Sequence, residues 1–77
     1  MDKKELILKV GTYCKDYRVN KMKTSLTKFS NLSKLNIKNV SAFEHGKANS
    51  IEYLYYYYIL SDEELKKEFS KGLFNIL

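Results

Sequence analysis

The sequence predicts an all-α fold, in which five short helices form one domain over all 77 residues. Three observations predict it. The chain has no proline and only three glycines, so little interrupts a helix. Apolar side chains recur at intervals of three and four residues, which is the spacing of a helix face. Serine or asparagine precedes several of these segments, where a side-chain oxygen can cap a first turn. At this length roughly 60–65% of the unfolded surface becomes buried, so we expect a small core.

The first two helices are expected over residues 3–19 and 26–33. The apolar stripe of the first comprises Leu6, Val10, Tyr13, Cys14 and Tyr17. Ser25 is placed to cap the second helix, because its hydroxyl can accept a hydrogen bond from a free backbone N–H. Leu26 and Phe29 are the second helix's candidates for the core, with Leu32 as a third.

A turn at Lys34 and Leu35 leads to the third helix, which we expect from Ile37 to His45. Asn36 is its candidate N-cap. Gly46 follows where a helix often ends in a left-handed residue.

The fourth helix is expected over residues 51–60, after a cap at Asn49 or Ser50. Its predicted inward face comprises Ile51, Leu54, Tyr55, Tyr58 and Ile59, and its predicted outward face Tyr53, Tyr56 and Tyr57. Ser61 and Glu64 match the capping-box pattern, so a fifth helix should begin there and continue to the C-terminus.

The net charge of +5 is unevenly distributed. Residues 15–47 carry a net charge of +6, whereas residues 48–77 carry −2. A basic middle beside an acidic tail is the electrostatic pattern of a protein that binds nucleic acid on one side. The alternative is a lysine-rich solvated surface without a partner.

Cysteine use and hydropathy favour a cytoplasmic protein away from the membrane. Cys14 stands alone, so no internal disulfide can form, and a reducing compartment fits best. The longest apolar run, residues 53–60, is too short to cross a bilayer. The thirteen lysines, one arginine and many Asn, Ile and Tyr residues are typical of AT-rich codons, which indicates a low-GC bacterium or its phage.

Nothing in the sequence predicts an enzyme. His45 is the only histidine, and a catalytic base would need a nucleophile and an orienting acid around it. One His and one Cys are too few for a metal site, and no glycine-rich phosphate loop exists. We therefore expect no catalytic residue, metal or cofactor.

Residues 40–54, VSAFEHGKANSIEYL, carry a resemblance to a known family. The chain resembles the helix-turn-helix family of Cro, lambdoid phage repressors and Xre-type bacterial regulators over about residues 5–65. The positions that match the family pattern in register are Val40, Ser41, Phe43, Glu44, Gly46 and Lys47. The resemblance implies a five-helix repressor-like domain, with the helix-turn-helix at about residues 25–46 and a C-terminal helix at residues 61–77 that can serve in dimerisation.

The chain departs from the family pattern at three points. Lys34 stands where the family usually has glycine, and a left-handed lysine there would cost about 1 kcal/mol. The link between the first two helices is one residue longer than usual. Ile37 occupies a position at which many members have a polar, base-reading side chain.

The resemblance implies that the outer face of the third helix enters the major groove of DNA. Its expected base-contacting residues are Asn36, Ile37, Lys38, Asn39, Ser41 and Ala42. Its expected phosphate-contacting residues are Lys21, Lys23, Thr27, Lys28, His45, Lys47 and Asn49. Lys38 can donate to guanine and Asn39 can pair with adenine. The alternative for each position is an ordinary solvated side chain.

The resemblance also implies a structural ion pair between Arg18 and Glu44, because family members often bridge the first and third helices in this way. A second expected surface is apolar. It comprises Tyr53, Tyr56, Tyr57, Leu73, Phe74 and Leu77. We expect this surface to bind a second copy or another protein, with stacking on single-stranded bases as an alternative for the tyrosines and completion of the core as an alternative for the C-terminal residues.

These observations together predict a sequence-specific regulator that binds double-stranded DNA. It would act as a homodimer on an operator in a bacterial cytoplasm, as a repressor of phage or mobile-element origin. The alternative is a protein-interaction module, such as an antirepressor or inhibitor, that uses the same fold to bind another regulator.

Overall fold

The computed structural model describes residues 2–77, and these form five α-helices and one 3-10 turn without any strand. The elements are α1 (Lys3–Asn20), α2 (Leu26–Ser33), α3 (Ile37–Glu44), the 3-10 turn η1 (Ile51–Tyr53), α4 (Leu54–Ile59) and α5 (Glu63–Ile76). The predicted all-α fold is confirmed. α2 has the predicted bounds, the other helix ends lie within two residues of the predicted ones, and the expected fourth helix is divided between η1 and α4.

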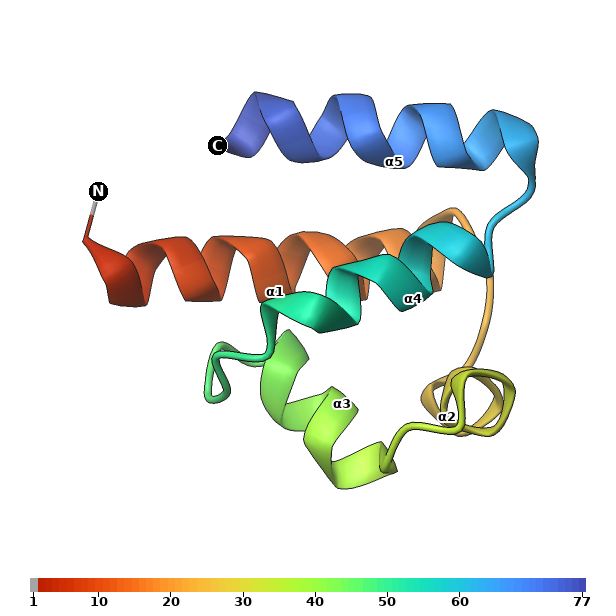
Figure 1. Cartoon of the computed structure of the whole chain (residues 1–77), viewed down its shortest axis with the longest axis horizontal. Helices are drawn as coiled ribbons and strands as arrows, with labels where there is room; N and C mark the ends of the chain where they lie inside the picture. Colours follow the sequence, from red (N-terminus) through yellow and green to blue (C-terminus); the bar gives the residue numbers. More distant parts are fainter. Residues whose placement is uncertain (1) are drawn as a thin grey trace.

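The helices lie in three layers (Figure 1). α1 and α4 form the middle layer, α5 covers one side of it, and α2 and α3 lie on the opposite side. α5 runs antiparallel to α1, so that the two ends of the chain lie at the same side of the molecule. Within residues 2–77, no helix is long and apolar enough to span a membrane.

Local capping residues set most helix ends. Ser25 Oγ accepts a hydrogen bond from Lys28 N at 3.1 Å at the start of α2. Asn36 Oδ1 accepts from the backbone N of Lys38 and of Asn39 at the start of α3. Gly46 follows α3 with a φ of 72°, as expected. These side chains satisfy N–H groups that a first turn leaves free, which is why the bounds of α2 and α3 could be predicted.

Two predicted caps are wrong. Asp62, not Ser61, caps α5, because Asp62 Oδ1 accepts from Leu65 N at 2.9 Å. Ser61 is buried, and its Oγ donates to Tyr57 O at 2.7 Å and lies 2.6 Å from Tyr17 Oη. Ser50 precedes η1 but makes no side-chain capping bond.

The core lies between the three layers. Its buried apolar residues are Val10, Cys14, Tyr17, Phe29, Val40, Phe43, Tyr57 and Phe69. The Tyr57 ring is central, with its centroid 4.4 Å from that of Phe29 and 6.3 Å from that of Phe69. Aromatic rings therefore join α2, α4 and α5.

The predicted orientation of the fourth helix is wrong. Tyr57, expected on the surface, is 0% exposed, whereas Tyr55, expected in the core, is 62% exposed. Tyr53 and Tyr56 are half-buried. Four consecutive tyrosines offer no contrast between apolar and polar positions, so periodicity cannot fix which of them faces inward. The 3-10 turn η1 also winds more tightly than an α-helix, which shifts the faces of the residues that follow.

The C-terminal residues divide between core and surface. Leu73 is half-buried and packs against the core. Phe74 and Leu77 are exposed, as expected of a surface.

Candidate nucleic-acid interface

A close contact between α1 and α3 fixes the inner side of α3. Gly11 on α1 is buried, and a Cβ at this position would collide with Phe43 O and lie 3.1 Å from Glu44 O. Only glycine lets α1 lie directly against the last turn of α3. Gly11 was not among the residues predicted from the sequence, although a glycine inside a helical pattern is a signal of such close packing.

Arg18 and Glu44 form the expected ion pair. Arg18 Nε and Nη2 donate to Glu44 Oε2 and Oε1, each at 2.8 Å, so the guanidinium and carboxylate face each other as two parallel hydrogen bonds. Arg18 is 5% exposed and Glu44 is 2% exposed. A third Arg18 nitrogen, Nη1, donates to Thr24 O at 2.9 Å. The pair therefore ties α1 to α3 and to the segment that leads into α2.

Tyr57 completes this buried network, which we call the Arg18–Glu44–Tyr57 network. Its hydroxyl donates to Glu44 Oε2 at 2.7 Å. Burial first, and then the hydrogen bond to Glu44, raise the pKa of Tyr57 far above its usual value. The hydrogen bond to Glu44 raises the pKa of Arg18. At neutral pH Arg18 is thus charged and Tyr57 is neutral, and the carboxylate between them has three donors.

The turn between α2 and α3 has Lys34 at the position where glycine was expected from the family pattern. Lys34 adopts the left-handed conformation, with φ 63° and ψ 21°, and its N–H donates to Ser30 O at 2.8 Å. Leu35 N donates to Ser33 Oγ at 3.2 Å, and Ser30 Oγ donates to Leu35 O. Three hydrogen bonds therefore hold a turn that glycine would adopt without strain, and they leave the Lys34 side chain in solvent.

The predicted base-contacting residues lie together on the outer side of α3. Four of them, Asn36, Ile37, Lys38 and Asn39, are exposed, and Ser41 and Ala42 are half-buried. Asn36 is limited as a base contact, because its Oδ1 already accepts two backbone hydrogen bonds and only its amide nitrogen is free. Lys38 and Asn39 keep their polar groups free, since no hydrogen bond engages either side chain in the described part of the chain.

The predicted phosphate-contacting residues are also exposed. They are Lys21, Lys23, Thr27, Lys28, His45, Lys47 and Asn49. Lys34, which was not predicted to contact phosphate, joins them in solvent. Between Tyr17 and Ile51 the sequence holds one acidic residue, Glu44, and it is buried against Arg18. The six lysines of this stretch are all exposed, and one of them, Lys21, lines a groove together with the carboxylates of Asp16 and Glu68.

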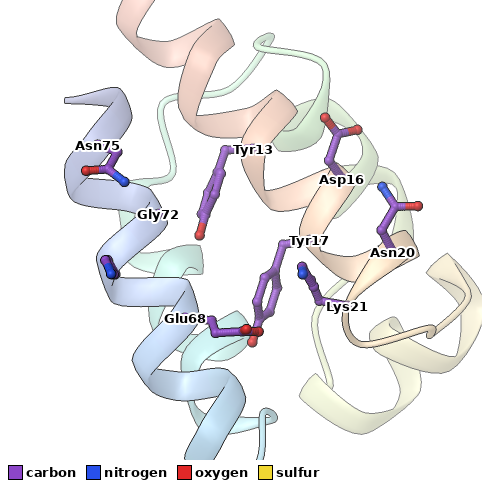
Figure 2. A pocket seen from close by; sticks show the side chains of 9 residues that line it. Tyr13, Asp16, Tyr17, Asn20, Lys21, Glu68, Gly72 and Asn75 are labelled. Carbon is purple, nitrogen blue, oxygen red and sulfur yellow. The ribbon is translucent and has the colours of Figure 1, made fainter.

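A groove of about 460 Å³ lies on the other side of the molecule, between α1 and α5 (Figure 2). Tyr13 and Tyr17 point from α1 across it toward α5. Tyr13 Oη donates to Phe69 O at 2.8 Å, and burial raises the pKa of Tyr13 to about 12. The rim mixes carboxylates and ammonium groups, Asp16 and Glu68 with Lys21 and Lys71. Because both signs of charge line the groove, its electrostatics favour neither an anionic nor a cationic ligand.

Within residues 2–77, no three His, Cys, Asp or Glu side chains gather as a metal site would require. Comparison with models of protein families, with curated proteins and with solved structures gave no match to this chain. The functional conclusion therefore depends on the geometry and charge of the chain itself.

Proposed function

We propose that this chain is a sequence-specific double-stranded DNA-binding protein that regulates transcription, and that α2 and α3 act as a helix-turn-helix. In this proposal α3 enters the major groove, and the exposed lysines around it contact phosphates. The proposed activity requires no catalytic residue, metal or cofactor. Its setting is the cytoplasm of a bacterial host, and its mode of action is repression by occupation of a promoter.

The observation that carries the proposal is the contrast between the two sides of α3. The inner side is held by Gly11, by the apolar residues Val40 and Phe43, and by the Arg18–Glu44–Tyr57 network. The outer side presents Lys38 and Asn39 to solvent. A recognition helix needs such a fixed back, because a base contact depends on side chains placed to within a fraction of an ångström.

The distribution of charge also supports DNA as the partner. The Arg18–Glu44 ion pair removes the one carboxylate of residues 17–51 from the surface, while six lysines remain exposed there. These are Lys21, Lys23, Lys28, Lys34, Lys38 and Lys47. Each phosphate that such lysines neutralise should contribute about −0.9 to the slope of log affinity against log salt concentration.

Selection of bound duplexes from a random library tests the proposal. We expect a defined sequence to be enriched, with two half-sites related by a two-fold axis and about one helical turn apart. A salt titration on the selected duplex should show a steep loss of affinity. Failure to enrich any duplex, or affinity that salt leaves unchanged, would contradict the proposal.

The residues of α3 are tested by the double change Lys38→Ala and Asn39→Ala. Both side chains are exposed and make no hydrogen bond, so the fold should be unaffected. We expect specific binding to weaken by roughly 1–3 kcal/mol for each bidentate pairing with a base that the change removes. The matched control is Lys67→Ala with Asn75→Ala on α5, an equal change on the opposite side. Equal affinity of the two variants for the selected duplex would refute the placement of α3.

An exposed apolar stripe supports a second candidate function, association with a protein. Ile51, Tyr55, Tyr58 and Ile59 recur at helical spacing along η1 and α4, and all are exposed. All four were predicted to face the core, and that prediction is wrong, whereas Tyr57 of the predicted interaction surface is buried. A second copy bound here would give the proposed homodimer, whereas another regulator bound here would make the chain an antirepressor or inhibitor.

Tyr55→Glu tests the stripe, because it places a charge on the most exposed tyrosine without touching the core. If the stripe is the homodimer interface, the variant should sediment as a monomer and lose affinity for a two-fold operator. Glu68→Gln on α5 is the control. A variant that keeps the wild-type mass in solution would exclude the stripe from dimerisation.

A further inference from the structure

The outer side of α3 contains a cationic hollow. It is lined by Lys38, Ser41, Ala42, His45 and Lys47, and its volume is about 300 Å³. Two ammonium groups and an imidazole surround it, and none of the lining residues is acidic. The nearest carboxylate in the sequence, Glu44, is buried and paired with Arg18. The chemistry of the lining therefore favours an anion.

The backbone fixes which nitrogen of His45 carries a hydrogen. Nδ1 lies 2.7 Å from Ser41 O, one turn back along α3. A carbonyl oxygen only accepts, so Nδ1 must donate this hydrogen bond. In the neutral ring, Nε2 then has a lone pair and no hydrogen, and it can act only as an acceptor.

This tautomer has a consequence for phosphate. The oxygens of a phosphodiester also only accept, so neutral His45 cannot hydrogen-bond to one through Nε2. Addition of a proton at Nε2 supplies the missing donor and leaves the bond from Nδ1 to Ser41 O intact. An anion in the hollow favours that charged form by its own negative charge.

Lys38 and Lys47 are the ionisable groups that share the hollow with His45. Both are cations, so they oppose a further positive charge on the imidazole until an anion enters the hollow and offsets them. α1 approaches this end of α3 through Gly11 and Leu8, neither of which ionises. Glu44 on the same helix and Tyr57 on α4 are committed to the buried network. His45 also lies at the C-terminal end of α3, where the helix dipole favours a cation.

We infer that this hollow is a phosphodiester-binding subsite, in which Lys47 supplies charge and His45 takes up one proton at Nε2 as the phosphate binds. The source of the phosphodiester rests on the proposed function, which makes it the DNA backbone. His45 thereby makes DNA affinity depend on pH near neutrality, where no other histidine can contribute.

The affinity of the selected duplex, measured at constant ionic strength from pH 5.5 to 8.5, tests the inference. Affinity should fall as pH rises, with a slope that approaches tenfold per pH unit for each proton taken up. His45→Gln should remove this dependence, because glutamine cannot take up the proton. Lys47→Gln should weaken binding and keep the pH dependence, and Lys67→Gln on α5 should change neither. Equal pH dependence in the wild type and in His45→Gln would overturn the inference.

A second measurement decides the subsite independently of DNA. Dimethyl phosphate, a diester that does not titrate in this range, is added to the full chain at pH 7 against sodium chloride of equal ionic strength. The imidazole nitrogen resonances of His45 should move toward the imidazolium form with the diester and stay unchanged with chloride. If no duplex binds but the diester does, the proposed function fails and the subsite stands. If the diester leaves His45 unchanged, the subsite fails.

Discussion

Replacement of Arg18 by methionine tests whether the Arg18–Glu44–Tyr57 network holds α3 in place. The change keeps an unbranched apolar stem, takes away the guanidinium and removes three hydrogen bonds, two to Glu44 at 2.8 Å and one to Thr24 O at 2.9 Å. Glu44 then keeps Tyr57 Oη as its one side-chain donor while it stays buried. An uncompensated buried charge is strongly destabilising, so the loss of stability far exceeds that caused by breaking a surface ion pair.

The expected magnitude is large for so small a domain. Removal of one partner of a buried ion pair costs about 3–5 kcal/mol. A domain of this length has a total unfolding free energy of roughly 4–12 kcal/mol. Arg18→Met should therefore remove a large fraction of the stability, and it should unfold the chain if the stability lies at the lower end of that range.

Urea denaturation followed by circular dichroism measures this effect. The double variant Arg18→Met with Glu44→Leu is the matched control, because it leaves no charge buried. Its destabilisation should be less than the sum of the two single changes by roughly 2–3 kcal/mol. The reasoning is refuted if Arg18→Met costs less than about 1 kcal/mol, the value of an exposed pair, or if the two single changes are additive.

Two further predictions concern the backbone and the buried acids. Lys34→Gly should stabilise the fold by roughly 0.5–1 kcal/mol in urea denaturation, because glycine adopts the left-handed turn without strain. The control is Lys34→Ala, which keeps the strain. If Lys34→Ala raised the stability as much as Lys34→Gly does, this explanation would be contradicted. Burial raises the pKa of Cys14 and of Tyr57, so above about pH 9 the unfolded chain loses protons that the folded chain keeps. Stability should then fall by about 1.4 kcal/mol per pH unit for each such proton. A urea midpoint that stays constant from pH 8 to 11 would exclude this linkage, and Cys14→Ala should move its onset upward toward about pH 10, where tyrosine ionises.

The network also bears on the proposed function. Arg18, Glu44 and Tyr57 come from α1, α3 and α4, and their contacts hold the inner side of α3. On the outer side, the side-chain hydrogen bonds are those of the Asn36 cap and of His45 Nδ1 with Ser41 O. Lys38, Asn39 and His45 Nε2 are consequently free for a ligand. A loosened network should weaken specific DNA binding more than it weakens nonspecific binding, since phosphate contacts tolerate misplacement better than base contacts do.

The sequence predicted those features of the fold that short-range chemistry decides. Ser25 and Asn36 could be identified as caps because their partners lie within three residues. Gly46 could be identified as a helix end because glycine adopts a positive φ without strain. The Arg18–Glu44 pair was predicted from the family resemblance alone, since no local pattern relates residues 26 positions apart.

Of the six residues predicted on the outer face of α3, four are exposed and Ser41 and Ala42 are half-buried, and the role of this face in binding bases and phosphates stays a prediction. The structure added two restrictions to it. Asn36 uses its side-chain oxygen as a cap, and His45 uses Nδ1 to bond Ser41 O. Both restrictions depend on side-chain geometry, which residue identity alone does not specify.

The sequence by itself determined that this chain is helical, where α2 and α3 begin and end, and that its positive charge gathers in residues 15–47. Only the tertiary structure decided which tyrosine enters the core and that Asp62 caps α5 in place of Ser61. The four tyrosines are chemically identical, and Tyr57 is selected because its hydroxyl alone reaches Glu44. Ser61 does not act as the predicted cap because Tyr17 and Tyr57 engage its hydroxyl from elsewhere in the fold. Where neighbouring residues have the same local preference for a buried or a capping position, contacts with distant parts of the chain decide which of them occupies it.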